Sequence, residues 1–143
     1  GNKSSNRQMT LNYTINKPAH IVFNYLADMQ KFASVHPVIT RIDNIEDNLY
    51  LVFETMRFGF IPFSFTYPVI VNSNSKACNV CIKATVMKIT SIEMMFSITT
   101  ANGGTIVHEE INFTSLLPIK SLMQKIFTKQ HKQLFLNIEK ASE

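Results

Sequence analysis

The longest regular pattern in the chain is a helical one at its C-terminal end. After Leu116, Leu117 and Pro118, apolar residues recur every three or four positions as far as Ile138, and Lys and Gln fill many of the positions between them. This spacing predicts an amphipathic helix with a wide apolar face. A helix of about 20 residues is roughly 30 Å long, enough to cross a small domain. We therefore expect it to pack across the β-rich segment before it and to leave an enclosed space between the two.

Alternating apolar and polar residues through the middle of the chain predict six consecutive strands. Residues that favour turns separate them, among them Gly59, Asn102 and Gly103. Lys88 is a weaker break, which fits either a turn or a bulge. The expected strands cover residues 38–46, 49–58, 62–71, 77–87, 89–100 and 105–115.

The N-terminal part of the chain adds one strand and two short helices. Residues 9–15 alternate well enough to form the first strand, and Asn16 and Pro18 predict a helix start with an Asn cap. Asp28 begins a second short helix, which ends before Pro37 because the residue before a proline avoids the α region. This order of elements is an α+β pattern. We interpret residues 1–8 as a disordered or tag-derived tail and residues 9–143 as a single domain.

Composition and charge narrow the class of protein. The chain has 143 residues, of which 45% are hydrophobic and 17% are charged, as in ordinary globular domains. Its net charge of +4 comes partly from lysines of the final helix, whereas its arginines are few and far apart. Because nucleic-acid readers add arginine clusters or aromatic platforms, we expect no nucleic-acid partner. The lysines fit a solvated helix face or a weak contact with an anionic membrane surface.

Two cysteines, Cys78 and Cys81, have the spacing of a redox or metal motif. In a strand, alternation would point the two side chains to opposite faces, and no second pair of ligands lies nearby. We interpret them as reduced structural thiols and expect neither a metal nor a cofactor. The absence of a disulfide framework favours an intracellular, cytoplasmic protein.

Three short motifs, in order along the chain, resemble one known superfamily. Residues 15–28 combine a strand end, Pro18 at a helix start and an aromatic-rich helix that ends in Asp. Residues 32–39 resemble a second helix with a His-Pro exit, with Val35 where the superfamily often places Trp. The Gly-Gly-Thr at 103–105 is similar to the turn before its last strand. The superfamily is SRPBCC, which comprises START-like and polyketide-cyclase-like proteins.

The resemblance spans essentially the whole domain, and it implies a particular fold. This is the helix-grip fold, in which a seven-stranded antiparallel sheet wraps around a long C-terminal helix, with two short helices after the first strand. Such a fold encloses an apolar pocket. Cyclase members orient a reactive chain with polar pocket groups rather than with a fixed triad, so the resemblance leaves both binding and catalysis open.

Strand and helix periodicity suggests which side chains line that pocket. The inward face of residues 62–71 stays open, because both of its faces are rich in apolar residues. The expected ligand-binding residues are Tyr25, Phe32, Phe65, Tyr67, Ile82, Met94, Phe96, Glu109, Ile111, Met123, Phe127 and His131.

Glu109 is the charged residue whose position in the alternation puts it among apolar neighbours. Facing a cavity, its carboxyl would have a raised pKa and would serve as a general base or as an anchor for a ligand hydroxyl. Two alternatives stay open: a bulge near Gly104 that turns Glu109 to solvent, or a pairing with a lysine or arginine. Glu109 is the one candidate catalytic residue.

Two histidines and several tyrosines are further polar candidates. His131 falls near the apolar face of the final helix, where it would contact a ligand or lie at the edge of the core. His36 falls at the expected rim of the pocket, where it would also cap backbone groups beside Pro37. The tyrosines Tyr25, Tyr50 and Tyr67 fit either pocket or core positions.

Three functions remain, in this order. The first is non-catalytic binding of a small hydrophobic molecule, such as a lipid, a quinone-like or a polycyclic aromatic compound, in the internal cavity. The second is a polyketide cyclase/dehydratase-like enzyme that uses Glu109 as its base, with a tyrosine or His131 as partner. The third is a surface interaction module with a filled core, in which the lysines of the final helix contact a partner or a membrane.

Overall fold

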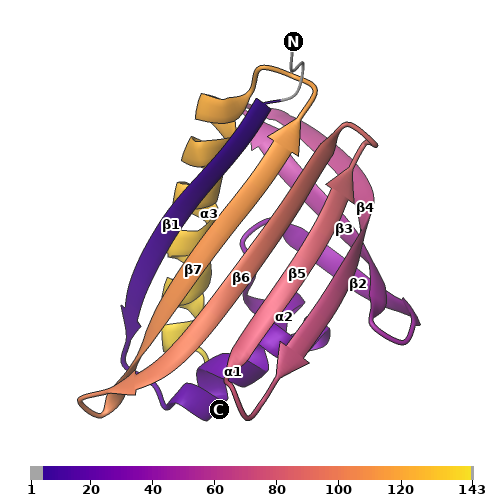
Figure 1. Ribbon diagram of the computed structural model, residues 1–143. Coiled ribbons are helices and arrows are strands. Elements are labelled where there is room, and N and C mark those ends of the chain that lie inside the picture. Colours follow the sequence, from indigo (N-terminus) through magenta and orange to yellow (C-terminus); the bar gives the residue numbers. More distant parts are fainter. Residues whose placement is uncertain (1–4, 143) are drawn as a thin grey trace.

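One antiparallel sheet of seven strands curves around a long helix (Figure 1). The computed structural model describes residues 5–142, with strand order β1-β7-β6-β5-β4-β3-β2. The expected helix-grip fold is confirmed. Its elements are β1 (Ser5–Ile15), α1 (Ala19–Ala27), α2 (Met29–Val35), β2 (Ile39–Glu46), β3 (Leu49–Phe58), β4 (Ile61–Asn74), β5 (Asn79–Val86), β6 (Thr90–Ala101), β7 (Gly104–Ser115) and α3 (Lys120–Lys140).

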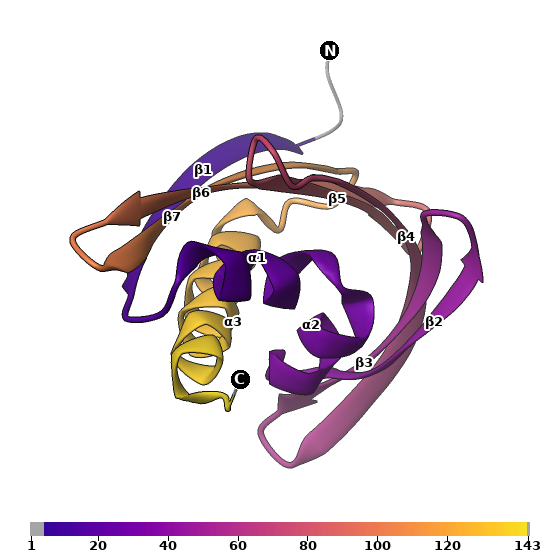
Figure 2. The same ribbon diagram turned by 90° about the horizontal axis from the view of Figure 1, so that it is seen from below.

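The first and last strands pair along their whole length, from Ser5 opposite Ser115 to Ile15 opposite Thr105. Seen from below, the sheet forms a curved wall, with α1, α2 and α3 on its concave side (Figure 2). α3 packs along β1, and α2 packs against β2 and α3. No helix within residues 5–142 is both long and apolar enough to cross a membrane.

The two short helices begin differently. The Oδ1 atom of Asp28 accepts hydrogen bonds from the backbone N–H groups of Gln30 (2.9 Å) and Lys31 (3.3 Å), so the predicted cap of α2 is confirmed. The predicted Asn16 cap of α1 is wrong, because the helix starts later and its N-cap is Pro18, which offers no side-chain hydrogen bond. The backbone N–H of Asn16 instead donates to Glu139 Oε2 of α3 at 2.7 Å.

Strand ends differ from the predicted ones where tertiary pairing decides them. β1 already begins at Ser5, because β7 offers pairing partners as far as Ser115. Residues 5–8 of the expected tail therefore belong to this strand. Residues 1–4 lie outside the described part of the chain. Cys78 precedes β5 in a turn, with a positive φ of 57°. Lys88 belongs to a turn, where it and Met87 have φ values of 60° and 53°.

The core lies between the concave face of the sheet and the helices. The C-terminal half of α3 is its centre: Leu134 and Ile138 are fully buried, and Phe135 stacks on Tyr13 of β1 with ring centroids 4.2 Å apart. The N-terminal half of α3 is less buried. This difference leaves room between that half of the helix and the sheet.

Candidate functional site

A cavity of about 260 Å³ lies between the concave face of the sheet and the N-terminal half of α3. Strands β2 to β6, helix α2 and α3 all contribute side chains to it. Most of them are apolar, and together with the enclosing helix they make a site suited to an apolar molecule. Its apolar lining residues include Phe32, Val52, Met56, Phe65, Val69, Ile82, Ala84, Ile92, Met94, Met123, Ile126 and Phe127.

The structure brings eight of the twelve expected ligand-binding residues to this cavity. Inward-facing Phe65 and Tyr67 also settle the face of β4 that the alternation left open. The eight are Phe32, Phe65, Tyr67, Ile82, Met94, Met123, Phe127 and His131.

The other four expected residues, Tyr25, Phe96, Glu109 and Ile111, do not line the cavity. The hydroxyl of Tyr25 donates to the backbone oxygen of Ser142 at 3.0 Å. Phe96 is covered by α3, and Ile111 is fully buried beneath Phe127. Periodicity placed all four correctly on inward faces, but packing of α3 decides which inward residues reach open space.

Glu109 is fully buried on β7 and pairs with His131 of α3. His131 Nδ1 donates a hydrogen bond to Glu109 Oε1 at 2.9 Å and lies 2.7 Å from Oε2. The inward interpretation of Glu109 is therefore correct and the solvent-facing bulge is wrong, since β7 keeps an unbroken register with both neighbouring strands. The partner is a histidine rather than a lysine or arginine. Burial raises the pKa of Tyr13, and the nearby Glu109 carboxylate raises it further.

Glu109 does not line the cavity and influences it only through His131. Its Oε2 atom is buried and accepts no hydrogen bond from any group within residues 8–142, because the Nδ1–H of His131 points to Oε1. The ring of His131 forms part of the cavity wall, between Phe127 (ring centroids 5.6 Å apart) and Phe96 (6.5 Å). The pair thus places a polarised imidazole against an apolar space.

Glu54 is a buried carboxyl that the sequence analysis missed. It lies on β3, is 8% exposed and lines the cavity, where the hydroxyl of Tyr67 donates to its Oε1 at 2.6 Å. Burial raises the pKa of Glu54, although the Tyr67 hydrogen bond and His131 both act to lower it. Burial and the Glu54 carboxylate together raise the pKa of Tyr67 well above its ordinary value. The available signal was the alternation of β3, in which Glu54 shares a face with Val52.

His36 supplies a third polar group. Its Nδ1 accepts from the backbone N–H groups of Val38 and Ile39, both at 3.3 Å, which confirms its expected capping role beside Pro37. With Nδ1 as the acceptor, the proton of the neutral ring sits on Nε2. Burial, and then the neighbouring His131, lower the pKa of His36 to about 3. The ring lines the cavity with its centroid 6.4 Å from that of His131.

His36, His131 and Glu54 therefore lie near one another in the wall of a mostly apolar space. Together His36, His131 and the Glu54–Tyr67 pair offer at least one N–H donor and several acceptors. Across the described residues, no three His, Cys, Asp or Glu side chains gather as a metal ion would require. The arrangement can orient an oxygen or nitrogen of a ligand whose remaining surface is apolar.

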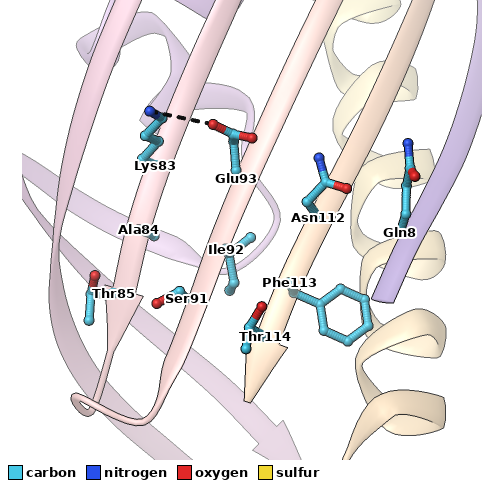
Figure 3. A pocket seen from close by; sticks show the side chains of 10 residues that line it. All are labelled: Gln8, Lys83, Ala84, Thr85, Ser91, Ile92, Glu93, Asn112, Phe113 and Thr114. Atoms are coloured by element: carbon cyan, nitrogen blue, oxygen red, sulfur yellow. Dashed lines mark ion pairs between the residues drawn. The ribbon is translucent and has the colours of Figure 1, made fainter. Parts of the chain in front are cut away.

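A second hollow, of about 600 Å³, lies on the convex face of the sheet (Figure 3). Side chains of Gln8, Asn112, Glu93 and Lys83 line it across four adjacent strands, and Lys83 Nζ forms an ion pair with Glu93 at 3.5 Å. Its lysine and many of its polar groups are exposed to solvent. The hollow thus lacks the enclosure that a hydrophobic ligand needs.

No known protein-family model matches the sequence, and no curated protein matches it either. Solved structures do match. Ara h 8.0201 has a TM-score of 0.77 at 14% identity, over 94% of this chain and 96% of its own. A START superfamily protein from Mycobacterium smegmatis has a TM-score of 0.77 at 11% identity (92% and 94% of the two chains), and the Zhui aromatase/cyclase from Streptomyces sp. R1128 has 0.72 at 12% (94% and 92%). The expected resemblance is confirmed at the level of the fold.

Proposed function

We propose that this helix-grip protein binds a small, mainly apolar molecule in the cavity between its sheet and α3. The observation that carries the proposal is a mostly apolar cavity whose wall also contains His36, His131 and Glu54. His36, His131 and Glu54 would hold the polar end of the ligand, and Phe65, Met94 and Phe127 would cover the rest. The match to a START superfamily protein and to an aromatase/cyclase supports a function centred on this cavity.

Burial of apolar surface would supply most of the affinity. A ligand that buries about 200 Å² of apolar surface gains roughly 5 kcal/mol at 25 cal/mol per Å². Part of this gain is offset by the lost freedom of the ligand. A hydrogen bond to a buried polar group then adds selectivity, because a ligand without the matching atom leaves that group unpaired.

The size of the cavity limits the ligand. Its volume of about 260 Å³ is below the usual range for drug-sized molecules, which begins at about 300 Å³. We therefore favour a molecule with one or two rings, or a short chain carrying a carbonyl or hydroxyl, over a complete phospholipid. Met94 and Met123, which are flexible lining residues, allow the space to adapt to ligand shape.

Native mass spectrometry of the purified protein, followed by solvent extraction, tests this proposal. We expect a stoichiometric hydrophobic adduct, or a rise in melting temperature with members of a panel of phenols, quinones and fatty acids. Ala84→Phe fills the cavity and should abolish both effects, whereas Thr85→Phe places the same side chain on the exposed face of β5. A protein without any adduct and without a thermal shift would contradict the proposal, as would binding that survives in Ala84→Phe.

One observation favours a second function, acid–base catalysis on the bound molecule. A histidine that faces a cavity and is held at Nδ1 by a buried carboxylate has the arrangement of a general base with its positioning residue. In this version His131 is the base, and Glu109 orients it without touching the substrate. Once a ligand is identified, the wild-type protein should convert it to a product. The His131→Gln variant should still bind the ligand but should not convert it. Equal conversion by both proteins would exclude His131 as the base.

A further inference from the structure

The entrance of the cavity carries an unusual concentration of exposed apolar side chains. Eight of the twelve large apolar residues that are exposed in the described part of the chain belong to the β3–β4 tip, the β5–β6 turn, the β7–α3 connection and the adjoining residues of β4 and α3. Among them, Phe60 is 97% exposed, Ile61 70% and Leu116 60%. We call residues 58–63, 87–89 and 116–122 the entrance surface. Exposed apolar patches of this kind mark interaction sites.

These segments meet at one end of the molecule. β3, β5 and β7 end there and β4 and β6 begin there, because the sheet is antiparallel, and α3 starts at the same end (Figure 1). Pairing of β4 with β5 starts only at Val69, so the β3–β4 tip is held by β3 alone and projects from the sheet. Hence a flat partner could reach all three parts together.

The entrance surface is continuous with the cavity. Phe58, Met87 and Leu117 belong to the entrance surface and also line the cavity. A row of aromatic rings leads inward from the β3–β4 tip and ends at the Tyr67 hydroxyl that is bound to Glu54. The successive centroid distances are 6.5 Å for Phe58–Phe63, 5.4 Å for Phe63–Phe65 and 5.8 Å for Phe65–Tyr67.

Charge at this end has one sign. The segments 57–63, 86–90 and 115–125 contain Arg57, Lys88, Lys120 and Lys125 but no Asp or Glu. All four basic side chains are exposed. A second copy of the chain would bring the same positive charges face to face, whereas an anionic surface would neutralise them. Apolar side chains that enter the acyl boundary, with lysines beside them at the headgroups, fit a bilayer that contains anionic lipid.

We propose that the entrance surface docks on an anionic lipid bilayer, with Phe60 and Ile61 inserted and the cavity open toward the acyl chains. Docking itself is independent of the function proposed above. Its consequence rests on that function: an apolar ligand passes between bilayer and cavity along the aromatic row without crossing water. The ligand class is then one that partitions into membranes.

Flotation with phosphatidylcholine vesicles, with and without phosphatidylserine, tests docking. Wild-type protein should bind the phosphatidylserine vesicles and should bind them less at high salt. The pair Phe60→Ser and Ile61→Ser should weaken binding by about a hundredfold, since each lost side chain removes roughly a tenfold contribution. Lys88→Glu with Lys120→Glu should also weaken it by about 25-fold or more, at roughly fivefold for each lost lysine.

Matched controls lie at the other end of the sheet. Ile45→Ser removes a side chain that is 56% exposed, and Lys76→Glu reverses an exposed charge in the β4–β5 turn; neither should alter binding. Absence of vesicle binding, or equal losses in the controls, would overturn the proposal. A different result would also overturn it: a protein that does not bind vesicles but forms a dimer, which the pair Phe60→Ser and Ile61→Ser converts to a monomer. Ala84→Phe should still bind vesicles, which separates failure of docking from failure of ligand binding.

Discussion

Nδ1 of His131 lies 2.7 Å and 2.9 Å from the two carboxylate oxygens of Glu109, and both side chains are almost fully buried. This contact joins α3 to β7 and holds one edge of the imidazole away from the cavity. The other edge is left for the cavity wall. One buried pair therefore serves both the attachment of the helix and the polarity of the proposed binding site.

The first prediction concerns the energy of this pair. Removal of one partner leaves the other buried and unpaired, so His131→Phe should lower the free energy of unfolding by about 3–5 kcal/mol. Combined with Glu109→Gln, the loss should be smaller than the sum of the two single losses, with a coupling of about 1–3 kcal/mol. Urea unfolding of the four proteins at neutral pH measures this coupling.

The exposed Lys83–Glu93 pair on the convex face is the matched control. Its side chains are 58% and 33% exposed, and its coupling should stay below about 1 kcal/mol. Additive losses at Glu109 and His131 would show that the buried pair contributes packing alone.

The second prediction concerns stability at acidic pH. Burial and His131 lower the pKa of His36 from 6.5 to about 3. Between these values the unfolded chain binds a proton that the folded protein does not, so protons favour unfolding. The contribution of His36 is fully present above pH 6.5 and falls with pH, by at most about 1.4 kcal/mol per pH unit.

His36→Asn keeps an acceptor for the Val38 N–H but cannot be protonated. Its free energy of unfolding should therefore change less between pH 6.5 and pH 4 than that of the wild type. Urea midpoints measured across this range supply the comparison. Parallel curves for the two proteins would mean that another group is responsible for the slope.

The third prediction concerns Glu54, whose pKa shift has the opposite sign. Burial raises the pKa of Glu54 above its ordinary 4.5, so its contribution to stability is present below pH 4.5 and is lost as the pH rises through the folded value. Glu54→Gln keeps an acceptor for the Tyr67 hydroxyl and avoids the buried charge. The variant should be more stable than the wild type at pH 7 and similar at pH 4. Thermal unfolding at both pH values tests this, and a variant less stable at pH 7 would refute it.

The helices, strands and turns were predictable because each is indicated by residues that are close together in the sequence. The spacing of Leu134 and Ile138 indicates a helix wherever the chain is read, and Asn102 with Gly103 indicates a turn without knowledge of any neighbour. The inward position of Glu109 also follows from alternation within one strand. Its partner does not, because 22 residues separate it from His131 and only the docking of α3 brings them together.

The Glu54–Tyr67 pair is a contact that local sequence patterns do not predict. Tyr67 lies opposite Val52 in the β3–β4 register, so it is the diagonal neighbour of Glu54 on the same face. A change of one residue in the register would separate the two side chains to opposite faces. Tyr25 shows the converse: its inward position on α1 was predictable, but the cavity lies beside α2. The shape of empty space depends on all elements together.

The last prediction concerns the Gly-Gly-Thr turn, whose three residues have different structural roles. Gly103 has a φ of +82°, where a side chain is strained, yet nothing lies near its would-be Cβ. A Cβ on Gly104 would lie 2.9 Å from the backbone oxygen of Ile15. Thr105 donates its hydroxyl to the backbone oxygen of Lys17 at 2.6 Å.

Gly104→Ala must therefore push β1 from β7 and should lower the free energy of unfolding by about 1–3 kcal/mol. Gly103→Ala meets only conformational strain, so its loss should be about 1 kcal/mol. Thr105→Val removes the hydrogen bond from the Thr105 hydroxyl to the Lys17 backbone oxygen, which also costs about 1 kcal/mol. Urea unfolding ranks the three variants, and amide exchange in β1 should rise most in Gly104→Ala. If Gly103→Ala lowered stability more than Gly104→Ala, the close approach of β1 would not explain the glycine at position 104.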